Sequence, residues 1–141
     1  MQRRNTPQYV LQTWAAFIIS LFLCAGGVWN LSSAEPLLNA FFALAMVFSL
    51  VATLTLAKTI RDNQNGRVDT GAWVGQSWAA FAVSIAFMLY GLYNAKLTGW
   101  QWGYMLGTWA FMVSASFTLA KTIRDEAEDK AGHPDETSET P

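Results

Sequence analysis

The sequence predicts an all-α integral membrane protein in which four transmembrane helices form two tandem helical hairpins. Three observations predict this class. Only 13% of the 141 residues are charged, about half the share usual in a soluble domain. The charges leave four uncharged stretches of 30, 22, 26 and 24 residues, whereas a bilayer span needs about 20 apolar residues. The second half of the chain also repeats the first half, which makes two similar hairpins the simplest organisation.

The four expected spans cover about residues 9–30, 36–58, 72–94 and 99–120. The first two spans begin with proline, which is favoured at the first helical position, and Thr6 before Pro7 is an N-cap. Asp69 or Thr70 caps the third span. The fourth span begins with Thr98-Gly-Trp-Gln101, which has the form of a capping box. The connections at 31–35 and 95–98 are short, so the two helices of each pair should be antiparallel neighbours.

The positive charges predict the orientation of the spans. Eight of the nine Lys and Arg residues fall on one side of the membrane, and only Lys96 falls on the other. By the positive-inside rule the side with eight is cytoplasmic, so both termini should lie in the cytoplasm of a bacterial cell. A cleaved signal peptide over the first span is the alternative. The repeat argues against it, because the matching third span lies in the middle of the chain.

Two repeats and a tail divide the chain into residues 1–66, 67–125 and 126–141. The octapeptide Thr-Leu-Ala-Lys-Thr-Ile-Arg-Asp occurs at 55–62 and again, without any change, at 118–125. The segment that precedes it has diverged, since 38–54 and 101–117 share only 2 of 17 residues. The tail has six acidic residues and almost nothing apolar, and we expect it to be disordered and cytoplasmic.

The first helices of the two repeats begin with the related motifs Gln12-Thr-Trp-Ala-Ala-Phe17 and Gln76-Ser-Trp-Ala-Ala-Phe81. Together with the octapeptide, these motifs make the chain resemble the YiaA/YiaB two-helix family of bacterial inner-membrane proteins. The resemblance covers both hairpins, about residues 9 to 125. It implies an integral inner-membrane protein with paired helices, and it implies no assigned reaction, cofactor or catalytic residue.

The repeated octapeptide has two possible roles. In the structural role, the two copies meet near a pseudo-two-fold axis along the membrane normal, or they contact the motif residues Gln12, Trp14, Gln76 and Trp78 at the same depth. In the binding role, they present charges at the cytoplasmic face to phospholipid headgroups or to an acidic protein partner. The candidate contact residues are Lys58, Arg61, Asp62, Lys121, Arg124 and Asp125.

Other polar or small residues in the spans favour helix packing. Gly99, Gly103 and Gly107 give the fourth span a doubled GxxxG face, which lets another backbone approach closely. The partner of this face is either the third span or another subunit of a homo-oligomer. Uncharged polar residues in or beside the spans should form interhelical hydrogen bonds; they are Gln12, Ser20, Asn30, Gln76, Ser84 and Asn94.

These features favour a non-enzymatic membrane component that binds lipids or a protein partner. We expect no metal or other cofactor, because the chain has a single Cys24 and a single His133, and no nucleic-acid binding, because no basic patch exceeds a few residues. No arrangement of residues suggests an enzyme. The alternative is a small uncoupled transporter or channel subunit, with a hydrogen-bonding path along Ser20, Ser84, Thr108 and Ser114.

Overall fold

The computed structural model describes residues 5–30, 35–64, 66 and 70–132. This part of the chain forms four helices, α1 (Pro7–Asn30), α2 (Pro36–Gln64), α3 (Gly71–Asn94) and α4 (Gly99–Ala131). The prediction of an all-α chain with four long helices is therefore confirmed. The predicted starts lie within two residues of the observed ones, because capping residues and prolines mark them in the sequence.

Threonine side chains cap three of the helix starts. The hydroxyl of Thr6 accepts a hydrogen bond from the backbone N–H of Tyr9. Of the two caps predicted for α3, Thr70 is the one used. Thr98 and Gln101 form the complete capping box at the start of α4. Because these bonds satisfy N–H groups that have no partner within the helix, the three threonines mark where α1, α3 and α4 begin.

The two helices that contain the octapeptides, α2 and α4, end differently. α2 stops at Gln64, just before Gly66, whose φ of +79° is the left-handed conformation that glycine adopts easily. α4 continues to Ala131, so the prediction of a disordered tail is wrong for residues 126–131. The ion pair between Arg124 and Glu128, one helical turn apart, supports this extension. The rest of the predicted tail, residues 133–141, lies outside the described residues.

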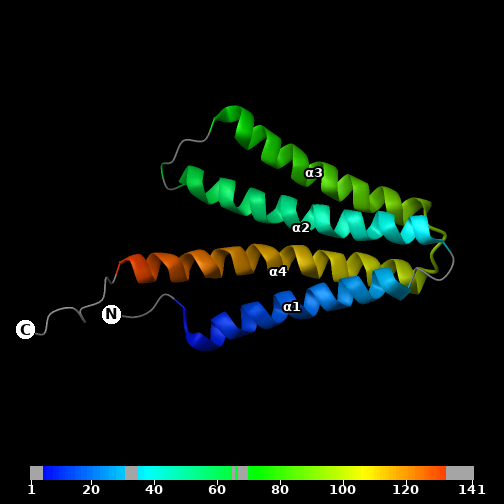
Figure 1. Ribbon diagram of the computed structural model, residues 1–141, viewed down its shortest axis with the longest axis horizontal. Coiled ribbons are helices and arrows are strands. Elements are labelled where there is room, and N and C mark those ends of the chain that lie inside the picture. Colours follow the sequence, from blue (N-terminus) through cyan, green and yellow to red (C-terminus); the bar gives the residue numbers. More distant parts are fainter. Residues whose placement is uncertain (1–4, 31–34, 65, 67–69, 133–141) are drawn as a thin grey trace, which may run out of the picture.

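Three of the described helices, α1, α2 and α3, are long and apolar enough to cross a membrane. α4 is not among them, because glycine, serine and threonine lower its mean hydropathy. It nevertheless carries no charge from Gly99 to Ala120 and lies between α1 and α2 along their length (Figure 1). Its position among apolar helices supports the prediction of a fourth span.

The helices lie side by side in the order α3, α2, α4, α1, with α2 and α4 parallel in the centre (Figure 1). α1 packs mainly against α4, and α3 packs mainly against α2. The helices of one hairpin contact each other less. The expectation that hairpin partners are the closest neighbours is therefore wrong: each outer helix packs against the second helix of the other repeat.

Two glycines explain why each outer helix packs against the opposite repeat. A Cβ atom at Gly27 of α1 would lie 2.7 Å from the ring of Tyr104 on α4. At the matching position in the other repeat, a Cβ atom at Gly91 of α3 would meet the ring of Phe41 on α2. Since only glycine leaves room for these rings, the two outer helices fit against the opposite repeat through equivalent contacts.

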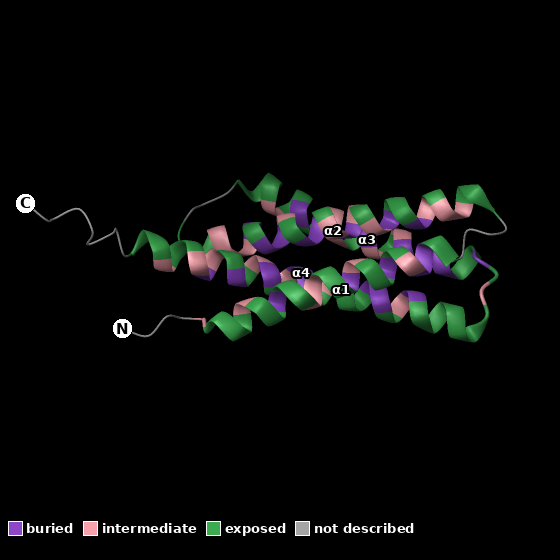
Figure 2. Cartoon of the chain, turned by 60° about the horizontal axis from the view of Figure 1, so that its bottom comes forward, coloured by how far each residue is buried: buried purple, intermediate pink, exposed green. Residues whose placement is uncertain are grey.

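The interior of the bundle lies where the four helices face one another, and Figure 2 shows buried positions alternating with exposed ones along each helix. The core is built from Cys24, Val28, Phe42, Ala45, Met88, Leu92, Met105, Trp109 and Met112. Large apolar side chains such as Phe22, Leu44 and Val83 are exposed along the helices. Such an apolar exterior is suited to contact with lipid.

Candidate functional site

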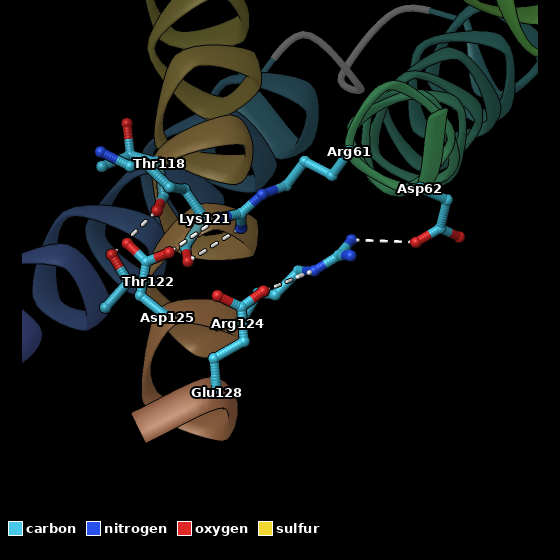
Figure 3. Close-up of polar contacts among 8 residues, drawn as sticks. All are labelled: Arg61, Asp62, Thr118, Lys121, Thr122, Arg124, Asp125 and Glu128. Carbon is cyan, nitrogen blue, oxygen red and sulfur yellow. Dashed lines mark hydrogen bonds and ion pairs between the residues drawn. The ribbon is translucent and has the colours of Figure 1, made fainter. Parts of the chain in front are cut away.

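The two octapeptides meet at one end of the bundle, at the C-terminal ends of α2 and α4. The guanidinium of Arg61 on α2 forms an ion pair with the carboxylate of Asp125 on α4, with an N–O distance of 2.7 Å (Figure 3). The same guanidinium donates a hydrogen bond of 3.1 Å to the backbone carbonyl of Lys121. Arg61 therefore binds both a side chain and the backbone of the second octapeptide.

The reciprocal pair is also present. Arg124 on α4 forms an ion pair of 3.0 Å with Asp62 on α2, and it also contacts Glu128 at 3.4 Å (Figure 3). Each repeat thus contributes an arginine that binds the aspartate of the other repeat. We call these four residues, Arg61, Asp62, Arg124 and Asp125, the Arg–Asp clasp. The hypothesis that the two octapeptides meet near a pseudo-two-fold axis agrees with this geometry.

A second layer of contacts lies one helical turn nearer the centre of the bundle. The hydroxyl of Thr59 lies 3.1 Å from that of Ser77 on α3, and Thr122 donates to the hydroxyl of Thr13 on α1 at 3.4 Å. These contacts are equivalent in the two repeats. Each joins an octapeptide to the first helix of the opposite repeat. At the other end of the bundle, the contacts of Gly27 and Gly91 join the same two pairs of helices.

Thr13 and Ser77 were missed by the sequence analysis, although they are the middle residues of the two Gln-x-Trp motifs. The flanking residues Gln12, Trp14, Gln76 and Trp78, which were expected to pack, are all exposed. A hydroxyl at the same place in both repeats was the available signal. This signal is weaker than the others, because the two residues differ in identity, while the glutamine and the tryptophan are repeated unchanged.

Several positions of the octapeptide have the same role in both copies. The second threonine bridges to the opposite repeat, the leucine (Leu56 or Leu119) is buried in the core, and the arginine and aspartate form the clasp. Lys58 and Lys121 are different, since both are exposed. Within the described part of the chain, neither ammonium group forms an ion pair.

The glycine face of α4 does not pack inside the chain. A Cβ atom at Gly99, Gly103 or Gly107 would meet no atom within 4 Å, and all three residues are exposed. Of the two alternatives for the partner of this face, the third span is wrong, because α3 packs against α2 on the far side of the bundle. Contact with another subunit stays a prediction.

The hydroxyl and amide groups inside the spans mostly bind their own helices. Ser20 and Ser84 each donate to the carbonyl three residues earlier, and Asn30 and Asn94 to the carbonyl four residues earlier. The expectation that these four residues link neighbouring helices is therefore wrong. A short side chain in an apolar helix is satisfied most easily by its own backbone.

Outside the octapeptides, two aromatic residues of α4 form interhelical hydrogen bonds. The hydroxyl of Tyr104 donates to the carbonyl of Leu23 on α1, at 2.9 Å. The indole N–H of Trp109 donates to the hydroxyl of Ser49 on α2, at 3.0 Å and in the buried centre of the bundle. Trp109 is thus a packing residue of the α2–α4 interface.

We expect Trp109→Phe to lower the free energy of unfolding by about 1 kcal/mol, because it removes a buried hydrogen bond and leaves most of the ring packing in place. Ser49→Ala should cost a similar amount. In the double variant the two effects should not add, since both substitutions remove the same bond. The measurement is thermal unfolding in detergent micelles, followed by circular dichroism. Fully additive losses would contradict a direct contribution of this bond.

No group of three or more His, Cys, Asp and Glu side chains within the described ranges is arranged to hold a metal ion. The aspartates of the clasp face arginines rather than one another. The arrangement is suited to holding two helices together and to presenting lysines beside the clasp.

Comparison with known proteins gives the family of this chain. The yiaA/B two helix domain matches residues 9–62 and 73–125, one copy in each repeat. Inner membrane protein YiaA of Escherichia coli (strain K12) is 26% identical over 122 residues, which cover 85% of this chain and 82% of that protein. No solved structure matches the chain significantly. The resemblance noted from the octapeptide is thus confirmed: the chain belongs to the yiaA/B two-helix-domain family and is a multi-pass inner-membrane protein.

Proposed function

We propose that this protein is a non-enzymatic component of the inner membrane that binds anionic phospholipid headgroups at its cytoplasmic face. The observation that carries the proposal is the division of charge in the octapeptides. The clasp pairs each arginine with an aspartate, whereas Lys58 and Lys121 are exposed and lie one helical turn before the arginines. Both ammonium groups are therefore available at the end of the expected membrane spans.

The proposed orientation places both termini and the clasp in the cytoplasm. It is supported by the eight basic residues on that side against one on the other. The cytoplasmic leaflet carries anionic lipids, and each lysine near that surface contributes about 1 kcal/mol of attraction. Two lysines at equivalent positions of two repeats would bind two headgroups, one on each side of the clasp.

The transport alternative receives less support from the structure. Of the four residues expected to form a path, Ser114 is exposed on the outside of α4. Ser20, Ser84 and Thr108 are buried, and their hydroxyl hydrogens are given to carbonyls of their own helices. These groups offer a passing solute few free donors.

We expect the double variant Lys58→Gln/Lys121→Gln to lose its preference for phosphatidylglycerol over phosphatidylcholine. The loss should be about fivefold in affinity for each lysine, which corresponds to about 1 kcal/mol. The measurement is native mass spectrometry of the lipids that remain bound after release from nanodiscs of the two lipids mixed equally.

The matched control is Lys96→Gln/Lys130→Gln, which removes the same charge from the opposite end of the bundle and from the far end of α4. This control should keep the wild-type preference. The proposal fails if the wild-type protein shows no preference, or if the two double variants behave alike. Because none of the four lysines belongs to the clasp, the fold should be retained in both.

A further inference from the structure

A pocket of about 300 Å³ lies between α1 and α4 at the end of the bundle opposite the clasp. It is lined by Gly27, Asn30, Trp100, Gln101, Tyr104 and Met105. This volume is at the lower end of the range for small-ligand sites. The exposed indoles of Trp29 and Trp100 occur at this end of the bundle, which is typical of the depth where a membrane meets water.

The lining offers both donors and acceptors and no charge. Gln101 uses its amide oxygen in the capping box, so its amide N–H groups remain as donors. Asn30 uses its amide nitrogen to reach the carbonyl of Gly26, so its amide oxygen remains as an acceptor. The hydroxyl of Tyr104 donates to Leu23, and its oxygen can still accept.

The other repeat shows what helix packing alone requires at this place. The positions equivalent to Gly27 and Asn30 are Gly91 and Asn94, so the α1 side of the pocket is repeated. On the other helix the equivalents of Trp100, Gln101, Tyr104 and Met105 are all apolar and without hydrogen-bonding groups; they are Leu37, Leu38, Phe41 and Phe42. The ring of Phe41 packs on Gly91 as Tyr104 packs on Gly27. Packing therefore does not need the polar groups of this pocket.

We propose that this pocket binds an uncharged group that carries several hydroxyls, as in a sugar. A hydroxyl both donates and accepts, which matches the mixed groups of Asn30 and Gln101. None of the described lining residues is charged, so they offer no ion-pair partner to a phosphate or an ammonium group. The rings of Trp100 and Tyr104 supply flat apolar surfaces for the C–H face of a sugar.

The test uses the full chain in phosphatidylcholine nanodiscs, prepared without glycoside detergents. The probe is radiolabelled octyl glucoside below its micellar concentration, and the comparison probe is octyl phosphocholine, which has the same alkyl chain and a charged headgroup. We expect saturable binding of octyl glucoside and at least about tenfold weaker binding of octyl phosphocholine, because the pocket cannot pair its charges. Equal binding of the two probes, or no saturable binding of octyl glucoside, would overturn the proposal.

The chain offers matched variants. Asn30→Ala and Trp100→Leu should each weaken octyl glucoside binding about tenfold, whereas Asn94→Ala and Trp102→Leu should leave it unchanged. Asn94 has the same position and the same backbone hydrogen bond in the other repeat, and Trp102 lies on the same helical turn outside the pocket lining. All four side chains are exposed, so the substitutions should not disturb folding. Equal effects of the two sets would also overturn the proposal.

Competition by free glucose identifies the source of the hydroxylated group. If glucose displaces octyl glucoside at similar concentration, the site takes a soluble sugar from the aqueous side. If glucose does not compete, the alkyl chain is required and the site takes a membrane glycolipid. Both outcomes require the saturable, Asn30-dependent binding described above.

Discussion

Arg61→Ala is expected to lower the free energy of unfolding by about 3 kcal/mol, because it leaves the carboxylate of Asp125 buried without its partner. The side chain of Asp125 is only 9% exposed, and Arg61 is its ion-pair partner. Arg124→Ala should cost about 1 kcal/mol, because Asp62 is more exposed and Arg124 shares its charge with Glu128 near the surface. Two pairs that are equivalent by symmetry should therefore differ in strength.

The measurement is unfolding by heat or by SDS in mixed micelles, followed by circular dichroism. The double variant Arg61→Ala/Asp125→Ala provides the decisive control. It should be more stable than Arg61→Ala alone, because no unpaired charge remains in the interface. If Arg61→Ala and Arg124→Ala cost the same, or if the double variant is the least stable of the three, the clasp does not hold the two repeats together in this way.

The sequence was sufficient to predict the helices, and the meeting of the octapeptides was one of the roles it left open. Prolines and capping threonines mark the helix starts, and these signals are local, so they need no knowledge of the fold. The eight identical residues in two copies indicated a shared constraint at the two helix ends. In the structure that constraint includes the two arginine–aspartate pairs.

The pairing of α1 with α4 could not be predicted in the same way. A soluble helix reveals its inner face by a stripe of apolar residues, but a helix in lipid is apolar on all sides. The regular spacing of Gly99, Gly103 and Gly107 predicts close packing on a face of α4 that contacts no other helix in the described part of the chain. Gly27 and Gly91 make the close contacts, and the signal for them was their equivalent position in the two repeats.

The other large effect is expected for substitution of these two glycines. Gly91→Ala should lower the free energy of unfolding by about 3 kcal/mol, since the new methyl group would collide with the ring of Phe41. That ring packs at a tilt against the ring of Phe87, with the centroids 4.2 Å apart, so it has little room to move. Gly27→Ala should cost about 1 kcal/mol, because the thioether of Met105 is flexible and Tyr104 lies at the surface.

Gly103→Ala and Gly107→Ala are the matched controls, and they should change stability in the opposite direction. Their Cβ atoms meet nothing within the chain, and alanine favours a helix over glycine by about 1 kcal/mol. The sign of the effect thus separates glycines that pack within the chain from glycines that do not.

If Gly103→Ala is instead destabilising, another copy of the chain must cover this face, and the oligomer in detergent should dissociate together with the loss of stability. If Gly91→Ala is as stable as the wild type, the exchange of helix partners between the repeats is wrong.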